Sequence, residues 1–487
     1  MLFNSIDFAI FLPIVFLLYW IVRYRSVKLQ NSLIVLASYV FYGWWDWRFL
    51  SLIIFSTIVD YFVSIQMQTE ENNKKRRSLL WLSLIINLGF LGVFKYYNFF
   101  LDNFSSVFSF FGSEINGRSL KIVVPVGISF YTFQTLSYTV DVYRKKLTAT
   151  KDFISFSAFV CFFPQLVAGP IERATSLLPQ FYKKRKFEYE KAVDGLRQIL
   201  WGLFKKIVIA DNCAEYANLI FNNSDSYSGS TLVLGAFFFT FQIYGDFSGY
   251  SDIAIGTSRL FGFNLNRNFN FPYFSRNIAE FWRRWHISLS TWFRDYLYIP
   301  LGGSKGSIGK KVRNVFIIFI VSGFWHGANW TFIVWGALNA FYFLPLMLTN
   351  NNRLNTDSTI AKGRFFPSVK EAFLMLMTFS LTVLAWVFFR AENVGHALRF
   401  IASIFSKNLF SVPSFNDLEG HPIFPKTILL VVMIFLLVEW IGRESQFAIQ
   451  HIAVRFNVFA RYIFYYAIIS AIYWLGAEEQ QFIYFQF

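Results

Sequence analysis

The stretch NVFIIFIVSGFWHGANWTFIVWGALNAFYFLPLMLTNNN, residues 314–352, decides the fold class of this chain. Only one of its side chains, His326, titrates near neutral pH. A single helix of this length, at ~1.5 Å per residue, would be almost twice as long as a hydrocarbon core of ~30 Å is thick. Gly323, Gly327 and Asn329 mark the place where a helix breaks most easily. We therefore expect two discontinuous helices that meet near His326 inside a lipid bilayer.

Apolar stretches of spanning length recur along the whole chain. Hydrophobic residues make up 55% of the composition, charged residues 15%, and the mean hydropathy is +0.42, which is too apolar for a soluble domain of this size. We predict an all-α, polytopic transmembrane protein with about eleven spans plus re-entrant or interfacial helices. One integral membrane domain is expected over residues 1–487, with N-terminal spans in 1–120, a core in 121–345 and C-terminal spans in 346–487. The expected spans outside 314–352 are residues 8–22, 33–45, 50–65, 78–94, 122–140, 195–210, 231–255, 371–389, 427–438 and 462–477.

The net charge of +16 indicates topology and not nucleic-acid binding. Most positive charges form short clusters between apolar stretches, such as residues 74–77, where the positive-inside rule expects cytoplasmic loops and contact with anionic lipid. Residues 1–22 lack a basic leader, and Arg23, Arg25 and Lys28 follow the apolar stretch. This order favours an uncleaved first span with its N-terminus outside. Residues 211–230 contain no Lys or Arg, which fits an outer loop.

His326 is the strongest candidate for a functional side chain. It lies 13 residues beyond Arg313, the last charge before the span, and therefore roughly 20 Å into the bilayer at helical rise. A titratable group at that depth is costly and indicates a functional site. The alternative is a structural histidine that is hydrogen-bonded to a neighbouring helix. His396, His421 and His451 lie near loop ends and are interpreted as ordinary interfacial histidines.

His286 lies in the segment FWRRWHISLSTWFRDYLYIPLGG, residues 281–303, which is too charged to span freely. Its alternating aromatic and basic side chains suit an interface, and equally a protein-lined funnel for an anionic donor. Its arginines fit phosphate contacts and lipid headgroups equally well. The segment YGDFSGYSDIAIG, residues 244–256, places Asp246 and Asp252 at the end of an apolar span. Because unpaired carboxylates there are costly, we expect them to pair with arginines of the 281–303 segment.

The two cysteines, Cys161 and Cys213, indicate neither a disulfide framework nor a zinc site. The sequence also lacks a Walker loop, a nucleotide fingerprint and a nucleophile elbow in usable context, which weakens ATP-driven transport as an interpretation. We therefore expect no metal and no bound cofactor.

Four blocks of the sequence resemble the membrane-bound O-acyltransferase family, in the branch that O-acetylates alginate and peptidoglycan. The resemblance covers nearly the whole chain, including the FIYFQF ending, and the last two blocks are the most specific. The blocks are VPVGISFYTFQTLSYTVDVYR from Val124, CFFPQLVAGPIERATSLLPQF from Cys161, FWRRWHISLSTWFRDYLYIPLGG from Phe281 and SGFWHGANWTFIVWG from Ser322.

This resemblance implies a ring of helices in which a cytoplasmic tunnel meets an outer funnel near an invariant histidine. That histidine corresponds to His326, and a second, less uniform polar position corresponds to His286. The implied reaction takes an acetyl group from a cytoplasmic thioester, acetyl-CoA or another acyl thioester, to a hydroxyl of an extracytoplasmic polysaccharide. The chain contains no soluble esterase-like domain, so a separate periplasmic SGNH esterase-like partner is implied for the final transfer. The implied location is the bacterial cytoplasmic (inner) membrane.

The chemistry of acyl transfer fits these residues. Transfer from a thioester to a hydroxyl needs a base, and desolvation keeps an imidazole neutral and able to accept the proton. His326 is assigned that role, with a transient acyl-histidine as a variant. His286 is expected to place the donor or to shuttle the proton. Further residues expected to shape the donor tunnel or to contact the substrate are Trp282, Arg283, Trp285, Arg294, Asp295, Asn329 and Trp330.

Two other functions remain open at this point. One is D-alanyl transfer to teichoic acid within the same fold. The GANW sequence after His326 separates it from acetyl transfer, because it resembles the acetylating branch more closely. The other is a polytopic transporter or flippase whose buried histidine relays protons.

Overall fold

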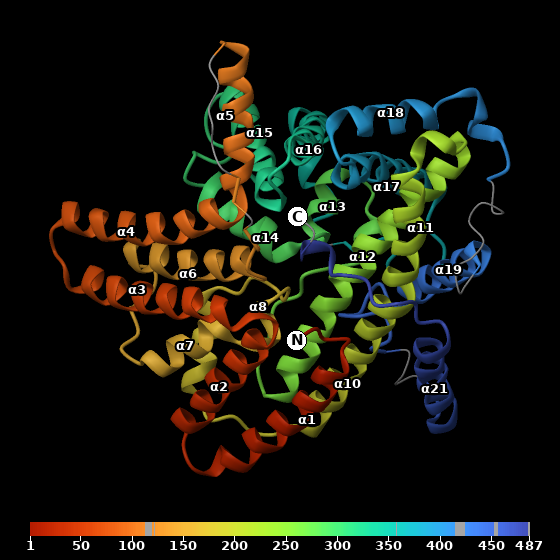
Figure 1. Ribbon diagram of the computed structural model, residues 1–487. Helices are drawn as coiled ribbons and strands as arrows, with labels where there is room; N and C mark the ends of the chain where they lie inside the picture. The colour runs from red at the N-terminus through yellow and green to blue at the C-terminus, as the bar shows by residue number, and fades with distance from the viewer. Residues whose placement is uncertain (113–118, 121, 357, 414–423, 452–455, 486–487) are drawn as a thin grey trace. The chain divides into compact units, whose positions relative to one another are not determined.

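A computed structural model of the protein describes residues 1–112, 119–120, 122–356, 358–413, 424–451 and 456–485 (Figure 1). Over these residues the chain forms helices joined by loops and turns, with none in a β-strand, which confirms the all-α fold class. The chain divides into two compact units. Unit 1 comprises Met1–Ala192 and Thr257–Asn266, and unit 2 comprises Val193–Gly256 and Arg267–Phe487. The single domain over residues 1–487 stays a prediction.

Unit 1 is built from the N-terminal helices. Side chains set where they begin: the Ser5 hydroxyl accepts from Phe8 N at the start of α1, and the Ser26 hydroxyl accepts from Leu29 N at the start of α2. The helices of this unit are α1 (Ile6–Ile21), α2 (Val27–Asp46), α3 (Leu50–Thr69), α4 (Asn73–Leu91), α5 (Tyr97–Phe110), α6 (Ile128–Tyr143), α7 (Phe153–Cys161), α8 (Phe163–Leu166) and α9 (Ala174–Leu177).

Two features of unit 1 bear on the predicted spans. The apolar stretch 153–170 is interrupted, because Phe162 leaves helical geometry at φ −51° and ψ 102° between α7 and α8. In the sequence, Pro164, Gly169 and Pro170 interrupt this stretch and favour a re-entrant or interfacial piece, and that character stays a prediction. Helix α5 was not expected, because residues 97–110 hold the polar side chains Asn98, Asp102 and Asn103 among their phenylalanines.

Unit 2 contains the remaining helices, and the boundary between the units falls within α10 and α12. Ser307, Asn329, Ser368 and Asn393 cap the starts of α15 to α18 with their side-chain oxygens. The helices are α10 (Tyr189–Leu203), α11 (Asp211–Asn222), α12 (Gly229–Leu260), α13 (Ile278–Arg284), α14 (Ile287–Phe293), α15 (Ile308–His326), α16 (Trp330–Leu348), α17 (Val369–Arg390), α18 (Val394–Ile404), α19 (Pro425–Ile441) and α21 (Val458–Trp474); the π-helical segment η5 (Phe204–Ala210) continues α10.

Within the described residues, five helical runs are long and apolar enough to cross a membrane. They correspond to six of the eleven expected stretches or to parts of them, and two of the runs combine consecutive helices. The total of about eleven spans stays a prediction. The five runs are Ile6–Tyr24, Val27–Thr69, Asn73–Phe110, Trp330–Leu348 and Val369–Arg390.

The two helices predicted within residues 314–352 are present as α15 and α16, which pack side by side (Figure 1). Glycines allow their backbones to touch. A Cβ on Gly323 would lie 2.2 Å from the carbonyl oxygen of Phe332, and one on Gly336 would lie 2.4 Å from that of Phe319. Any larger residue at either position would push the two helices apart, so these glycines fix the hairpin that carries His326.

Candidate active site

His326 is the last residue of α15 and is 3% exposed. Four aromatic rings surround its imidazole, with ring centroids 4.9 Å away for Trp325, 5.2 Å for Trp335, 5.3 Å for Phe389 and 5.6 Å for Tyr484. These rings come from α15, α16, α17 and the C-terminal segment, so distant parts of unit 2 build one enclosure. The helix break places the imidazole at a helix end, where its direction is set by the hairpin.

His286 lies beside His326, with 6.5 Å between the two ring centroids. It is 0% exposed and stands between α13 and α14 at φ 43°, a left-handed conformation that costs a non-glycine residue of order 1–3 kcal/mol. Strained backbone conformations of this kind cluster at functional sites, where they hold a side chain in a required orientation. Phe247 packs edge-to-face against the imidazole of His286, with 4.6 Å between the ring centroids. The structure therefore brings together the two histidines that the sequence singled out.

Asn268 fixes the tautomer of His286. Its Oδ1 accepts from Ser288 Oγ at 2.9 Å and from Ser288 N at 3.3 Å, while its Nδ2 donates to Ser251 Oγ at 3.2 Å. Because Oδ1 is an acceptor, the His286 Nδ1 that lies 3.1 Å away must donate to it. The proton is thereby assigned to Nδ1, and Nε2 is the acceptor nitrogen. Burial lowers the pKa of His286 to about 3, so the ring is neutral at neutral pH.

The C-terminal segment completes the enclosure, which sequence reasoning missed. Asp246 accepts from Ile483 N at 2.7 Å, and Lys206 donates to the carbonyl oxygen of Gln480 at 2.9 Å. Phe482 lies 4.2 Å from Tyr250 between ring centroids. These contacts hold the segment so that Tyr484 reaches the histidines. The FIYFQF ending was noticed in the sequence, but nothing local in it shows which part of the chain it contacts.

The expected pairing of Asp246 and Asp252 with arginines of the 281–303 segment is wrong. Asp246 pairs with Lys206 at 2.9 Å, and Asp252 pairs with Lys205 at 2.5 Å. Glycines again explain the geometry: a Cβ on Gly245 would lie 2.8 Å from the carbonyl oxygen of Lys205, so α12 and η5 are close enough for lysine to reach aspartate.

The arginines of that segment have other acidic or backbone partners. Arg284 pairs with Glu280 at 2.9 Å. Arg283 donates to the carbonyl oxygens of Asn352 at 2.7 Å and Leu354 at 3.0 Å. The guanidinium group of Arg283 therefore holds the loop that follows α16.

The other predicted site residues fall into two groups. Trp282 and Trp285 belong to the aromatic cluster behind His326: Trp282 lies 5.6 Å from Trp335, and Trp285 is 1% exposed. Asn329 donates to the carbonyl oxygen of Glu392 at 2.9 Å.

The second group lies at the surface of unit 2. Arg294 pairs with Asp295 at 2.8 Å with side chains that are 58% and 36% exposed, and Trp330 is 54% exposed. All three side chains are exposed, and their contribution to a donor tunnel stays a prediction.

No group of three or more His, Cys, Asp or Glu residues is arranged to hold a metal ion in the part of the chain that the structure describes. Cys161 and Cys213 are buried free thiols.

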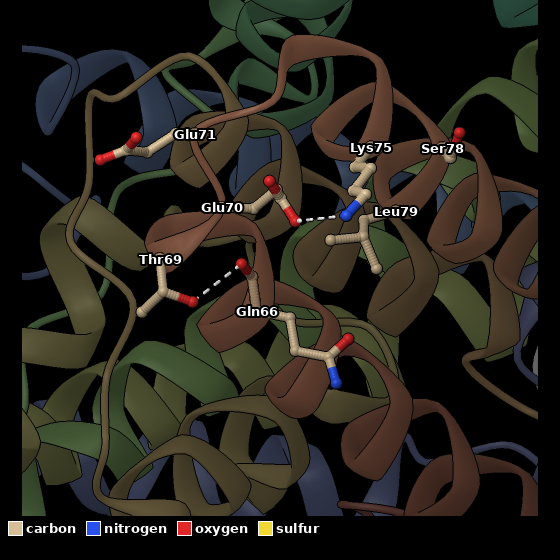
Figure 2. Close-up of a pocket in the computed structure, with 7 residues that line it drawn as sticks. All are labelled: Gln66, Thr69, Glu70, Glu71, Lys75, Ser78 and Leu79. Atoms are coloured by element: carbon tan, nitrogen blue, oxygen red, sulfur yellow. Dashed lines mark hydrogen bonds and ion pairs between the residues drawn. The ribbon is translucent and has the colours of Figure 1, made fainter.

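Unit 1 contains a separate pocket of about 620 Å³ at the turn between α3 and α4. Figure 2 shows the ion pair between Lys75 and Glu70 at 3.9 Å, and the Thr69 hydroxyl that donates to the carbonyl oxygen of Gln66 at 3.1 Å. Of the described residues that line this pocket, none was predicted for the active site.

Comparison with known proteins defines the class to which this site belongs. The sequence model of MBOAT, the membrane-bound O-acyltransferase family, matches residues 39–388. The chain belongs to the membrane-bound O-acyltransferase family, and it is an O-acyltransferase of the membrane.

Individual relatives sharpen this assignment. The chain is similar to a probable alginate O-acetylase AlgI of Azotobacter vinelandii, at 39% identity over 89% of this chain and 84% of the relative. It is also similar to a peptidoglycan O-acetyltransferase of Helicobacter pylori, at 37% identity over 84% of this chain and 80% of the relative. A teichoic acid D-alanyltransferase of Bacillus subtilis matches at 30% identity over only 44% of this chain and 57% of the relative.

Proposed function

We propose that this protein moves an acetyl group from a cytoplasmic thioester, acetyl-CoA, across the membrane to a hydroxyl of an extracytoplasmic polysaccharide. The observation that carries the proposal is a buried His326 at a helix break, enclosed by four aromatic rings and 6.5 Å from the neutral His286. Two relatives named as O-acetylating proteins support acetyl as the group, since each covers more than four fifths of this chain.

In this proposal His326 acts as general base. The acceptor hydroxyl oxygen attacks the thioester carbonyl carbon while the imidazole of His326 takes the hydroxyl proton. The tetrahedral intermediate then collapses, the carbon–sulfur bond breaks, and the thiolate leaves with that proton. An acyl-histidine formed on His326 is the covalent variant of the same reaction. His286, with its Nε2 as acceptor, supports the proton transfer or the placement of the donor.

A periplasmic esterase-like partner is part of the proposal. The acyl group reaches the polysaccharide either directly or through that separate protein, in a bacterial inner membrane with the N-terminus of this chain outside. The D-alanyl alternative has weaker support, because the teichoic acid D-alanyltransferase of Bacillus subtilis covers less than half of this chain.

The test uses the purified full chain in proteoliposomes with radiolabelled acetyl-CoA on one side and a polysaccharide acceptor, with or without the partner protein, on the other. Wild-type protein should transfer label to the acceptor, and His326→Ala should not, at equal amounts of folded protein. Full transfer by His326→Ala would refute the base role. Movement of intact substrate without transfer of label would indicate the transporter or flippase instead.

A further inference from the structure

A second pocket, of about 300 Å³, lies in unit 2 and is distinct from the histidine enclosure. It is formed where the end of α11 and the following 3-10 turn meet the start of α18 (Figure 1), and Phe221 of α11 stacks on Phe400 of α18 with 4.3 Å between the ring centroids. The absence of Lys and Arg from residues 211–230 predicts that this part of the chain faces outward.

Hydrogen bonds between its two walls hold the pocket in shape. Ser224 Oγ and His396 Nε2 are 3.2 Å apart, and His396 is only 8% exposed. Arg390, the last residue of α17, donates to Asn218 Oδ1 at 2.7 Å and to Asn222 Oδ1 at 3.3 Å. The pocket is therefore pre-formed, and His396 has a role that its position near a loop end did not predict.

The pocket is joined to the loop that follows His326. Asn329, which caps α16, donates to the carbonyl oxygen of Glu392, and Glu392 lines the pocket. Three residues before Glu392, the ring of Phe389 packs against His326 at 5.3 Å. A ligand held in the pocket would therefore lie next to the segment that walls the active site.

The lining chemistry selects the class of ligand. Six lining side chains carry an amide, a hydroxyl or an imidazole, and such groups both donate and accept, as sugar hydroxyls do: Asn222, Asn223, Ser224, Ser226, Asn393 and His396. The charged lining side chains described are Asp225, Glu392 and Arg399, so positive charge is not in excess and an anionic ligand is not favoured. Phe221 also lines the pocket but is only 1% exposed.

We propose that this pocket binds an uncharged, hydroxyl-rich segment of the acceptor glycan and holds the polymer beside the outer end of the active site. The proposal rests on the proposed function, because it identifies the acceptor that the acyl group reaches. A glycan fits better than a protein partner, since the centres of protein interfaces are apolar and depleted in charge, whereas this concavity is small and polar.

The experiment measures binding to the purified full chain in lipid nanodiscs by calorimetry. Two probes are compared: cellohexaose, which is neutral, and a mannuronate hexasaccharide, which carries one carboxylate per sugar. Ser226→Trp fills the pocket from an exposed position, and Leu398→Trp is the matched control on α18, because Leu398 is exposed and does not line the pocket.

Cellohexaose should bind the wild type. Its affinity for Ser226→Trp should be lower by about tenfold or more, and its affinity for Leu398→Trp should equal that of the wild type. The mannuronate hexasaccharide should bind more weakly than cellohexaose, and Asp225→Asn with Glu392→Gln should strengthen its binding about threefold. Equal binding of cellohexaose to wild type and Ser226→Trp would overturn the proposal, as would tighter binding of mannuronate than of cellohexaose.

A cellular assay separates the remaining outcomes. If Ser226→Trp lowers polysaccharide acylation while neither probe binds the purified wild type, the pocket contacts a protein and the glycan proposal is wrong. His326→Ala should bind cellohexaose normally and fail to acylate. If His326→Ala still acylates, the proposed function fails, while the binding result for the pocket is judged independently.

Discussion

Asp60 in α3 of unit 1 and His326 in α15 of unit 2 are both titratable groups buried in long apolar helices, and their surroundings differ. Polar groups surround Asp60: Ser83 Oγ donates at 2.5 Å, Asn87 Nδ2 at 3.0 Å and Thr139 Oγ1 at 3.4 Å. Aromatic rings surround His326. The polar side chains around Asp60 donate hydrogen bonds to its carboxylate, which indicates a structural role. The aromatic rings around His326 suit an imidazole that takes part in the reaction. Depth in the membrane alone does not distinguish the two.

The largest effect is expected from a direct test of this distinction, in which His326 and Asp60 are each replaced by asparagine. His326→Asn should lower acyl transfer by about 10²–10⁴-fold, because a positioned base contributes on that order. Asp60→Asn should keep the transfer rate per folded molecule. Rates are measured in proteoliposomes and normalised to folded protein from size-exclusion chromatography. A comparable loss of rate in Asp60→Asn would show that unit 1 takes part in the chemistry.

The next effect concerns the charges that hold the C-terminal segment. Lys206 pairs with Asp211 at 2.7 Å and with Asp246 at 2.9 Å. Lys206→Met would leave both carboxylates buried without a cation, and we expect a loss of about 3–5 kcal/mol in the free energy of unfolding. The measurement is chemical unfolding in detergent, followed by fluorescence.

The matched control for Lys206→Met is the neighbouring substitution Lys205→Met. Lys205 pairs with Asp252, whose side chain is 13% exposed, so water can solvate that carboxylate and the loss should be smaller. Equal losses in the two variants would contradict a special role for Lys206.

A third prediction concerns pH. His286 lies outside the five candidate spans, with a pKa of about 3 in the folded protein against an ordinary value of 6.5. Between these values the unfolded chain binds a proton that the folded chain does not, so stability falls as the pH is lowered. We expect a loss of about 2 kcal/mol between pH 6.5 and 5.

Unfolding curves at the two pH values measure this loss, and His286→Gln is the comparison because glutamine does not titrate there. The pH dependence of the variant should be smaller by that amount. An unchanged pH dependence would mean that His286 is protonated in the folded state.

The smallest effect is expected at Asp60. The Ser83 and Thr139 hydroxyls can rotate to accept from an amide, so Asp60→Asn should cost only about 1 kcal/mol of unfolding free energy. Chemical unfolding in detergent measures this cost, in the same experiment as Lys206→Met and Lys205→Met. A cost as large as that of Lys206→Met would indicate an ionised carboxylate whose charge the surrounding donors stabilise strongly.

The sequence predicts some of this molecule well because the signals are local. The break after His326 follows from glycines and a capping asparagine within a few residues, and the long apolar stretches fix the all-α class. His326 could be named because a titratable side chain is rare among such apolar neighbours, whereas His286 was named because its block resembles the family. Helix α5 was not predicted, because its polar residues interrupt the apolar stretch in the sequence.

The other features that the sequence did not predict depend on contacts between distant segments. Whether Asp246 pairs with a lysine or an arginine is decided by how closely Gly245 lets α12 approach η5. Tyr484 reaches His326 only because Lys206 and Asp246 anchor the segment before it. No periodicity in the sequence records such pairings.

The contact between Gly323 and Phe332 also restricts where an acyl donor can travel. At Gly323 and Gly336 the backbones of α15 and α16 are so close that not even a Cβ fits between them. In the proposed function, the acyl donor would therefore approach the imidazole of His326 along the outer side of these two helices. Under this proposal, a wider range of donors would require substitutions on that outer side. Substitutions at Gly323 or Gly336 would only push α15 and α16 apart.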